Sequence, residues 1–356
     1  MINVTKTYLP PFKEYTHILK RAWDKAWITN NGELVKELEE NLKAYLGCKN
    51  LLFCGNGTVV LQMALKALNI TKEVITTPFS YVATTNSVLW EGCTPVFVDI
   101  EAGSCCIDAD KIEKAITDNT QAILATHVYG YPCDVDKIEM IAAKYDLKVI
   151  YDAAHAFGCE YKGKSLLSFG DISTCSFHAT KIFHTVEGGC IISNNEEINR
   201  KLFLFRSFGH IADDYFSIGI NGKNSEMHAA MGLCILPRLP DIIEKRKEFS
   251  AAYNNLLDLN KIRRPFSSAA FNYNYAYYPV IFETEEVLLK VRKALADNDI
   301  FARRYFYPSL NTLPFLKGQH CSVSENICSR VLTLPLYYDL GLDSVNLIAK
   351  LINNSL

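Results

Sequence analysis

The stretch with the most chemical promise is Ser173–Gly189, which contains Lys181. It begins like a β-strand, and a Glu-Gly-Gly turn at its end leads into a second apolar run. Apolar neighbours disfavour a charged ammonium and lower its pKa, so this lysine is a candidate neutral amine that can form a Schiff base. A lysine at a strand end whose ammonium reaches solvent is the commoner arrangement. The stretch alone does not decide between the two.

A second candidate is Asp152, which ends an apolar run and is followed by His155. A carboxylate at such a buried position is costly without a cationic partner. That partner can be a basic side chain in a structural salt bridge, or the protonated ring nitrogen of a bound heterocycle. His155 by itself fits an ordinary hydrogen-bonded core histidine.

Two further features could hold parts of a ligand. The glycine-rich turn Gly55–Thr58 leads from an apolar run into a helical stretch. The free N–H groups and the positive dipole end of a helix start favour an anion, most often phosphate, although many such turns contain glycine only for tight geometry. Tyr81 opens a later helical stretch and offers an aromatic face.

Together these four features match the four chemical handles of pyridoxal 5′-phosphate (PLP). The turn suits its phosphate, Asp152 its ring nitrogen, Tyr81 its ring face and Lys181 its aldehyde carbon. Each feature is weak alone, but their occurrence in one chain points to PLP as the cofactor.

The predicted elements that position these residues are strands and helices in alternation, as far as residue 240. This alternation predicts a mostly parallel sheet covered on both faces. Several candidate residues then fall at the carboxyl ends of strands, where open α/β sheets bind ligands. The predicted strands are Asn50–Cys54, Glu73–Thr77, Pro95–Asp99, Gln121–His127, Lys148–Asp152, Ile172–Ser176 and Gly189–Ser193.

The pattern changes near residue 240. We predict two domains, a large PLP-binding α/β domain over residues 1–240 and a small C-terminal α+β domain over residues 241–356. Alternating residues at Lys261–Pro265 and Tyr273–Phe282 predict exposed strands. The predicted helices of this part are Ile242–Leu257, Glu285–Asn298 and Ser344–Asn353.

Composition excludes several classes of protein. The chain has 356 residues and a net charge of −2, without the basic excess expected of a nucleic-acid binder. Its 12 cysteines are scattered without a Cys-x-x-Cys pair, which predicts reduced core cysteines and no metal site. The N-terminus shows no signal pattern, and no apolar run reaches the ~18 residues of a membrane span. We therefore expect a cytoplasmic protein without membrane contact.

The chain resembles the nucleotide-sugar aminotransferase family of the DegT/StrS type, within the fold-type I PLP enzymes. The most specific match is Ser-Phe-His-Ala-Thr-Lys, ending at Lys181, followed by Glu-Gly-Gly at residues 187–189. The resemblance covers essentially the whole chain. It implies an α/β, aspartate aminotransferase-like fold with a mostly parallel, seven-stranded central sheet. It also implies PLP as cofactor and a homodimer with shared active sites.

The resemblance also implies a role for each candidate residue. Lys181 would form the Schiff base and Asp152 would pair with the ring nitrogen. Asn221 lies in a loop that would reach the cofactor phosphate of the partner subunit, and Asn224 departs from the methionine usual in that loop. Other cofactor contacts are expected from Gly57, Thr58, Tyr81, His155 and Ser176, and substrate contacts from Thr29, Asn30, His184, Lys223 and Tyr305.

The implied activity is transfer of an amino group from L-glutamate to a nucleotide-linked keto-deoxysugar, as in deoxysugar and O-antigen or lipopolysaccharide biosynthesis. Asn3–Pro10, Trp27–Gly32 and Arg303–Pro308 look most like members that convert dTDP-4-keto-6-deoxy-D-glucose to dTDP-4-amino-4,6-dideoxy-D-glucose. Alternatives are a C3 aminotransferase on a dTDP-3-keto-6-deoxyhexose, an amino-cyclitol aminotransferase, and a non-catalytic regulatory or binding protein. A related dehydratase branch has histidine in place of the lysine, so Lys181 argues against it.

Overall fold

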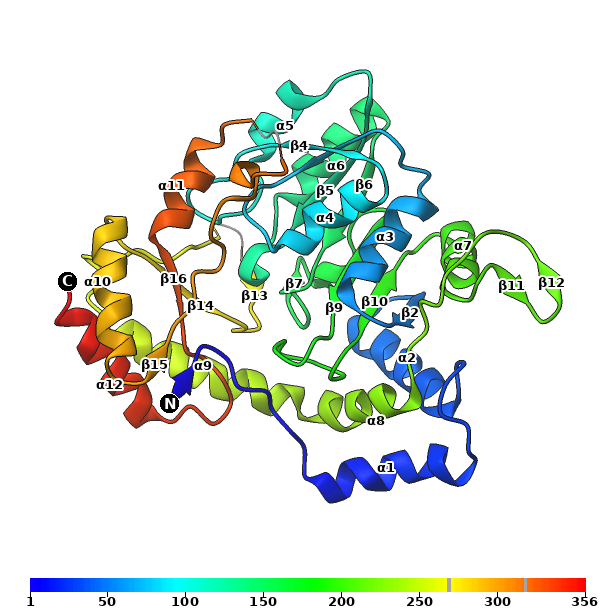
Figure 1. Cartoon of the computed structure of the whole chain (residues 1–356), viewed down its shortest axis with the longest axis horizontal. Helices are drawn as coiled ribbons and strands as arrows, with labels where there is room; N and C mark the ends of the chain where they lie inside the picture. Colours follow the sequence, from blue (N-terminus) through cyan, green and yellow to red (C-terminus); the bar gives the residue numbers. More distant parts are fainter. Residues whose placement is uncertain (268–269, 317–318) are drawn as a thin grey trace.

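A seven-stranded sheet forms the centre of the protein (Figure 1). The computed structural model describes residues 1–267, 270–316 and 319–356. β10 runs antiparallel to both its neighbours, and the other six strands point the same way, which confirms the predicted mostly parallel sheet. In sheet order the strands are β2 (Leu51–Cys54), β10 (Gly189–Ile192), β9 (Ile172–Ser176), β6 (Lys148–Asp152), β5 (Thr120–Thr126), β3 (Glu73–Thr76) and β4 (Thr94–Phe97).

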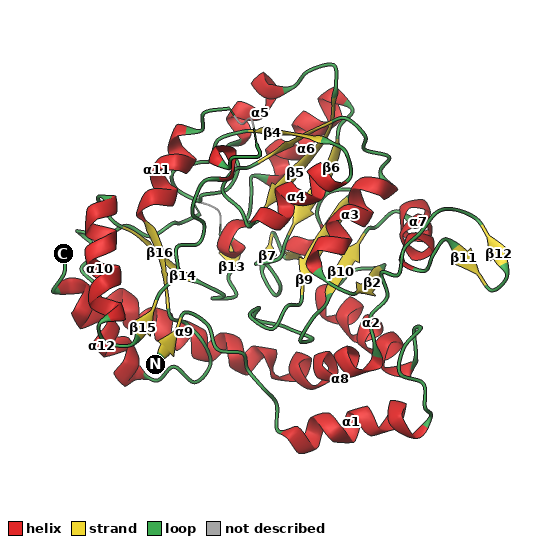
Figure 2. Cartoon of the chain, viewed as in Figure 1, coloured by secondary structure: helices red, strands yellow, loops and turns green. Residues whose placement is uncertain are grey.

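Helices cover both faces of this sheet (Figure 2). Because side chains alternate along a strand, Ile150 packs toward α3, whereas Val149 and Tyr151 face the opposite core. One layer contains α3 (Gly57–Ala67), α4 (Val82–Trp90) and α7 (Glu196–Arg206). The other contains α2 (Glu33–Leu46), α5 (Ala109–Ala115), α6 (Val135–Tyr145) and α8 (Glu226–Ile235).

The C-terminal part has its own apolar cluster. The predicted exposed strands are wrong in extent and burial, because only Tyr278–Ile281 forms a strand there, all four of its residues are buried, and Arg263 makes an isolated bridge to Ile281. The elements are α9 (Leu239–Leu256), β14 (Tyr278–Ile281), α10 (Glu285–Ala296), β15 (Ile300–Phe301), α11 (Ser322–Arg330), β16 (Val331–Leu334) and α12 (Leu342–Asn353).

The N-terminal residues lie with the C-terminal part of the chain, since β1 (Ile2–Asn3) pairs with β15. α1 (Phe12–Asp24) then packs along α8, and a hairpin of β11 (His210–Ile211) and β12 (Asp214–Tyr215) projects from the body (Figure 1). The domain boundary at residue 240 stays a prediction. The remaining short elements are η1 (Val128–Gly130), β7 (Glu160–Tyr161), β8 (Lys164–Ser165), η2 (Leu166–Ser168), η3 (Leu236–Arg238), β13 (Phe271–Asn272) and η4 (Leu310–Thr312).

The 12 cysteines are all free and buried, as expected for core cysteines. Within the described ranges, no helix combines the length and apolar character needed to cross a bilayer. The same residues contain no group of three or more His, Cys, Asp or Glu side chains placed to hold a metal ion.

Candidate active site

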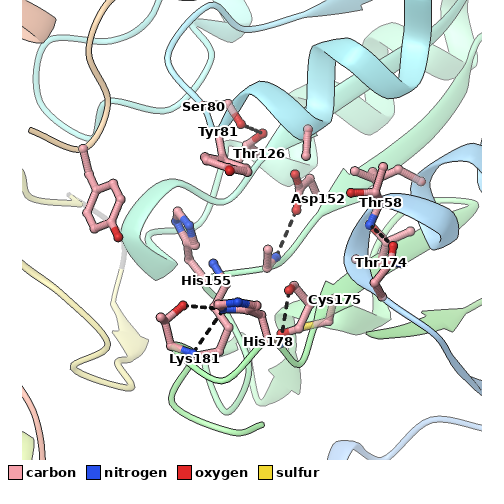
Figure 3. A pocket seen from close by; sticks show the side chains of 18 of the residues that line it. Thr58, Ser80, Tyr81, Thr126, Asp152, His155, Thr174, Cys175, His178 and Lys181 are labelled. Carbon is pink, nitrogen blue, oxygen red and sulfur yellow. Dashed lines mark hydrogen bonds between the residues drawn. The ribbon is translucent and has the colours of Figure 1, made fainter. Parts of the chain in front are cut away.

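A cavity of about 260 Å³ opens where β6 and β9 end and α3 begins (Figure 3). The sheet register sets its floor, because Asp152 pairs with Thr126 on one neighbouring strand and with Thr174 on the other. These three residues therefore lie in a row at the carboxyl edge of the sheet. Eight residues singled out in the sequence line the cavity: Gly57, Thr58, Tyr81, Asp152, His155, Ser176, Lys181 and Tyr305.

The N-terminus of α3 forms one wall. Asn56 caps this helix, since its side-chain oxygen accepts hydrogen bonds from the N–H groups of Thr58 and Val59 at 3.0 and 2.8 Å. A Cβ added at Gly57 would lie 2.8 Å from the Cβ of Ser176, so only glycine allows this close approach. The helix dipole and the hydroxyl groups of Thr58 and Ser176 suit a phosphate at this wall.

A buried ion pair fixes the strand that leads into this wall. The Arg206 guanidinium is 2.5 Å from the Glu39 carboxylate and donates to the Phe53 carbonyl at 2.8 Å. The same Glu39 oxygen accepts the Phe53 N–H at 2.8 Å. Both backbone groups of Phe53 are thereby anchored, and the turn at Gly55 starts from a fixed strand end.

Asp152 is buried and accepts two hydrogen bonds. Oδ2 accepts from the hydroxyl of Thr84 at 2.7 Å, and Oδ1 accepts from the Ala154 N–H at 3.1 Å. Burial raises the pKa of Asp152, against the hydrogen bonds from Thr84 and Ala154 and the charge of Lys181. Within the described residues no basic side chain lies within 4.0 Å of its carboxylate. A carboxylate in this setting fits the ring nitrogen of PLP, which would supply the missing cationic partner.

Lys181 lies in the loop between β9 and β10. The loop closes on itself, since a Cβ at Gly188 would lie 2.1 Å from the hydroxyl oxygen of Thr185, which explains one glycine of Glu-Gly-Gly. Phe183 anchors the loop by stacking on Phe157 with ring centroids 4.5 Å apart. The position of the lysine is therefore set by packing on both sides.

The amino group of Lys181 donates a hydrogen bond to the hydroxyl of Tyr277 at 3.3 Å. Burial lowers the pKa of Lys181, but Tyr277 and the Asp152 carboxylate outweigh it, so the net pKa is raised. The apolar sequence around the lysine predicted the opposite direction. The polar groups responsible come from other parts of the chain, and the local sequence does not reveal them.

His155 presents a fixed ring to the cavity. Its Nδ1 accepts the N–H of Tyr129 at 3.1 Å, and its ring stacks on Phe306 with centroids 5.6 Å apart. Burial is the largest cause that lowers the pKa of His155, so the ring is neutral and carries its proton on Nε2. This nitrogen can donate to the ring hydroxyl side of PLP.

Five residues predicted for the site lie outside this chain's cavity. Thr29 and Asn30 form an exposed turn. His184 is buried, and both of its ring nitrogens bond within the chain, Nε2 to the carbonyl of Tyr8 at 2.7 Å and Nδ1 from the N–H of Val186 at 3.3 Å. The other two, the exposed Asn221 and the half-buried Lys223, lie near the base of the hairpin.

Several lining residues were not found from the sequence. Tyr277 comes from the C-terminal part, where no local pattern marks it, and Arg303 opens the Arg303–Pro308 stretch, which resembles the family but predicted no site role for Arg303. Thr84 does not line the cavity but bonds Asp152 from behind it, and it was recognisable because it lies one helical turn after Tyr81. The remaining polar lining residues are Asn56, Ser80, Thr126, Thr174, His178, Thr180 and Glu187.

The family model of the DegT/DnrJ/EryC1/StrS aminotransferase family matches residues 12–353. The chain belongs to this family. Aminotransferases of the family depend on PLP, and the cavity offers a partner for the phosphate, the ring nitrogen and the aldehyde of that cofactor. This confirms the predicted enzyme class, fold and cofactor.

Characterised relatives span the whole chain. The dTDP-4-amino-4,6-dideoxy-D-glucose transaminase of Shigella dysenteriae is 41% identical over 99% of this chain and 98% of its own length. The GDP-perosamine synthase of Escherichia coli O157:H7 is 33% identical over 96% and 94%, respectively. Among solved structures, DesI in the presence of its TDP-sugar product is 30% identical, covers 99% of this chain and 92% of that chain, and superposes with a TM-score of 0.94.

Proposed function

We propose that this family member moves an amino group from L-glutamate to C4 of dTDP-4-keto-6-deoxy-D-glucose, giving dTDP-4-amino-4,6-dideoxy-D-glucose. The observation that carries the reaction type is the arrangement of Lys181 and Asp152 in one cavity with the N-terminus of α3. The substrate assignment is supported by the 41% identity to the Shigella transaminase of that sugar. We also retain the prediction of a cytoplasmic location.

Different residues of the cavity would bind different parts of the cofactor and move the proton. Gly57, Thr58 and Ser176 would hold the phosphate, and Asp152 would hold the protonated ring nitrogen. Bound PLP supplies an electron sink for the charge left when the donor loses its Cα proton. Lys181 would bind the cofactor aldehyde and, once released, would take and return that proton as general base and acid.

Arg303 supplies a cation for the carboxylates of the amino donor. It lines the same cavity as Lys181, and its guanidinium lies 4.8 Å from the ring centroid of Tyr305. No carboxylate of the described residues lies within 4.0 Å of Arg303, in contrast to its neighbour Arg304, which pairs with Glu285 at 2.7 Å. An unpaired arginine at a cavity wall suits the planar carboxylate of L-glutamate.

A second copy of the chain is the proposed partner. Asn221 lies outside the cavity of its own chain, as a residue that serves the neighbouring site would. The segment around the hairpin exposes apolar side chains that a subunit interface would cover. These include Phe208, Tyr215, Phe216 and Ile218, of which Tyr215 is 78% exposed. We therefore propose a homodimer with shared active sites.

The deciding experiment supplies purified chain, PLP and L-glutamate with either dTDP-4-keto-6-deoxy-D-glucose or a dTDP-3-keto-6-deoxyhexose, and identifies the product by NMR. We expect a new amine at C4 from the first sugar only. Lys181→Ala should lack both the visible band of lysine-bound PLP and the product. Amination at C3 would move the assignment to the alternative regiochemistry. Absence of a spectral response to any amino donor would contradict the aminotransferase assignment.

A further inference from the structure

Three buried hydroxyl groups form a chain that ends on Asp152. Thr126, the last residue of β5, donates to the Ser80 hydroxyl at 3.2 Å. The hydroxyls of Ser80 and Thr84 are 2.7 Å apart, and Thr84 donates to Oδ2 of Asp152 at 2.7 Å. All three hydroxyl residues are at most 2% exposed. Figure 3 shows Ser80, Thr126 and Asp152 on the same side of the cavity.

The direction of this chain follows from the number of protons. Each hydroxyl has one proton to donate, and an ionised carboxylate can only accept. Thr84 must therefore donate its proton to Asp152. It follows that Ser80 donates to Thr84 and that Thr126 donates to Ser80. The three O–H dipoles all point their positive ends toward the carboxylate, and hydrogen bonds in series polarise one another.

We propose that Thr84, supported by Ser80 and Thr126, is a positioning residue that keeps Asp152 ionised and aimed at the ring nitrogen of the cofactor. The proposal rests on the proposed function. Thr84 fixes one carboxylate oxygen and the Ala154 N–H fixes the other. The carboxylate cannot rotate without losing both bonds. The hydrogen bond from Thr84 also opposes the upward effect of burial on the pKa of Asp152.

The neighbouring residue provides a comparison within the same helix. Thr85 is as fully buried as Thr84, but its hydroxyl oxygen has no hydrogen-bond partner among the described residues. A buried threonine on α4 is thus tolerated without a partner. The contacts of Thr84 are specific to its place beside Asp152, and Thr85 is the matched control.

The test compares the binding of PLP and 1-deaza-PLP, which lacks the ring nitrogen but keeps the aldehyde and phosphate. Equilibrium dissociation constants are measured for the wild type, Thr84→Val, Thr84→Ser and Thr85→Val. A hydrogen bond to a charged group changes an equilibrium by about tenfold to hundredfold. We expect Thr84→Val to raise the dissociation constant of PLP by this factor. The dissociation constant of 1-deaza-PLP should be nearly unchanged. Thr84→Ser should restore PLP binding, and Thr85→Val should match the wild type.

Two results would overturn the proposal. If Thr84→Val weakens the binding of both compounds equally, Thr84 contributes only packing. If the binding of both compounds is unchanged, the hydrogen bond of Thr84 has no effect on the cofactor. If Thr84→Val does not fold, Ser80→Ala tests the next link, with a smaller selective loss of PLP expected and the same two results decisive. Failure of the proposed function is distinct, because it would appear as PLP-bound wild-type protein that gives no spectral response to any amino donor.

Discussion

The amino group of Lys181 and the hydroxyl of Tyr277 are 3.3 Å apart, although 96 residues separate them in the chain. Lys181 belongs to a loop of the central sheet, whereas Tyr277 directly precedes β14 of the C-terminal part. The hydroxyl oxygen of Tyr273 lies 3.1 Å from the carbonyl oxygens of both Tyr129 and Tyr277, so its single proton is shared between them and holds this segment. The two parts of the chain thus meet at the candidate catalytic amine.

Tyr277→Phe should leave PLP attached but slow the reaction with L-glutamate by about five- to tenfold, since a typical hydrogen bond is worth ~1 kcal/mol. The reason is that the released amine of Lys181 loses the group that positions it. Stopped-flow absorbance in single turnover measures this rate. Tyr278→Phe is the control, because that buried hydroxyl bonds Asn254 at 2.7 Å and lies on another network. Equal slowing by both variants would contradict a specific role for Tyr277.

Asp152→Asn should retain PLP and lose about hundredfold or more in kcat, equivalent to ~2.7 kcal/mol of barrier. The amide oxygen can still accept the Ala154 N–H, and the amide nitrogen can donate to the hydroxyl oxygen of Thr84, so the side chain stays in place. A neutral amide cannot hold the ring nitrogen protonated, and the electron sink is weakened. Steady-state kinetics and the thermal midpoint are measured together. Near-normal kcat with unchanged stability would remove Asp152 from the mechanism.

Gly57→Ala should weaken PLP binding, because the new methyl would lie 2.8 Å from the Cβ of Ser176 and push it from the phosphate wall. Gly55→Ala is the control two residues away, where a methyl would meet the carbonyl oxygens of Lys223 and Gly222 at 3.7 and 3.9 Å, which are ordinary contacts. Dissociation constants for PLP and for pyridoxal, which lacks the phosphate, are compared. We expect a loss specific to PLP in Gly57→Ala, and loss of both compounds would argue against a phosphate site here.

The site residues that could be predicted from the sequence are those whose positions are determined by the central sheet. Asp152 ends a strand, and the parallel register alone brings it beside Thr126 and Thr174 at the edge where ligands bind. Tyr277 could not be predicted in this way. It follows an irregular segment in which Tyr275 has a φ of +53°, and its contact with Lys181 exists only after the two parts of the chain pack.

Histidines show a second limit of sequence reasoning. His155 and His184 both lie in stretches shared with the family, but only His155 lines the cavity. The difference is decided by the hydrogen bond from His184 to the carbonyl of Tyr8, a contact 176 residues distant in sequence. The direction of the pKa shift of Lys181 could not be predicted from its neighbours either. Its pKa is raised by partners that the local apolar sequence does not include.

Shared active sites predict that two defective chains can complement each other. Lys181→Ala and Asn221→Ala should each have low activity, and hybrid dimers formed by co-expression should regain it. One hybrid site then combines the intact Lys181 of one chain with the intact Asn221 of the other. The control mixes Lys181→Ala with Asp152→Asn, which line the same cavity of one chain and so cannot complement. Recovery in both mixtures, or in neither, would contradict the proposed sharing, and ultracentrifugation establishes that hybrids form.

His127 should make stability depend on pH. It is fully buried, stacks on Tyr151 with centroids 4.6 Å apart, and its Nδ1 accepts the Cys133 N–H at 3.1 Å. Burial lowers the pKa of His127 to about 3, against about 6.5 in the unfolded chain. Between these values the unfolded chain binds a proton that the folded protein does not. Stability is therefore full above about pH 6.5 and falls as the pH decreases toward 3, by up to ~1.4 kcal/mol per pH unit.

His127→Asn removes this proton while keeping an acceptor for the Cys133 N–H, so its free energy of unfolding should fall less steeply with decreasing pH. Urea unfolding between about pH 7 and pH 5 measures the slope, which is independent of any overall loss of packing. His17→Asn is the matched control, because it replaces an exposed histidine in the same way. An unchanged slope in His127→Asn would show that His127 is protonated equally in the folded and unfolded chains.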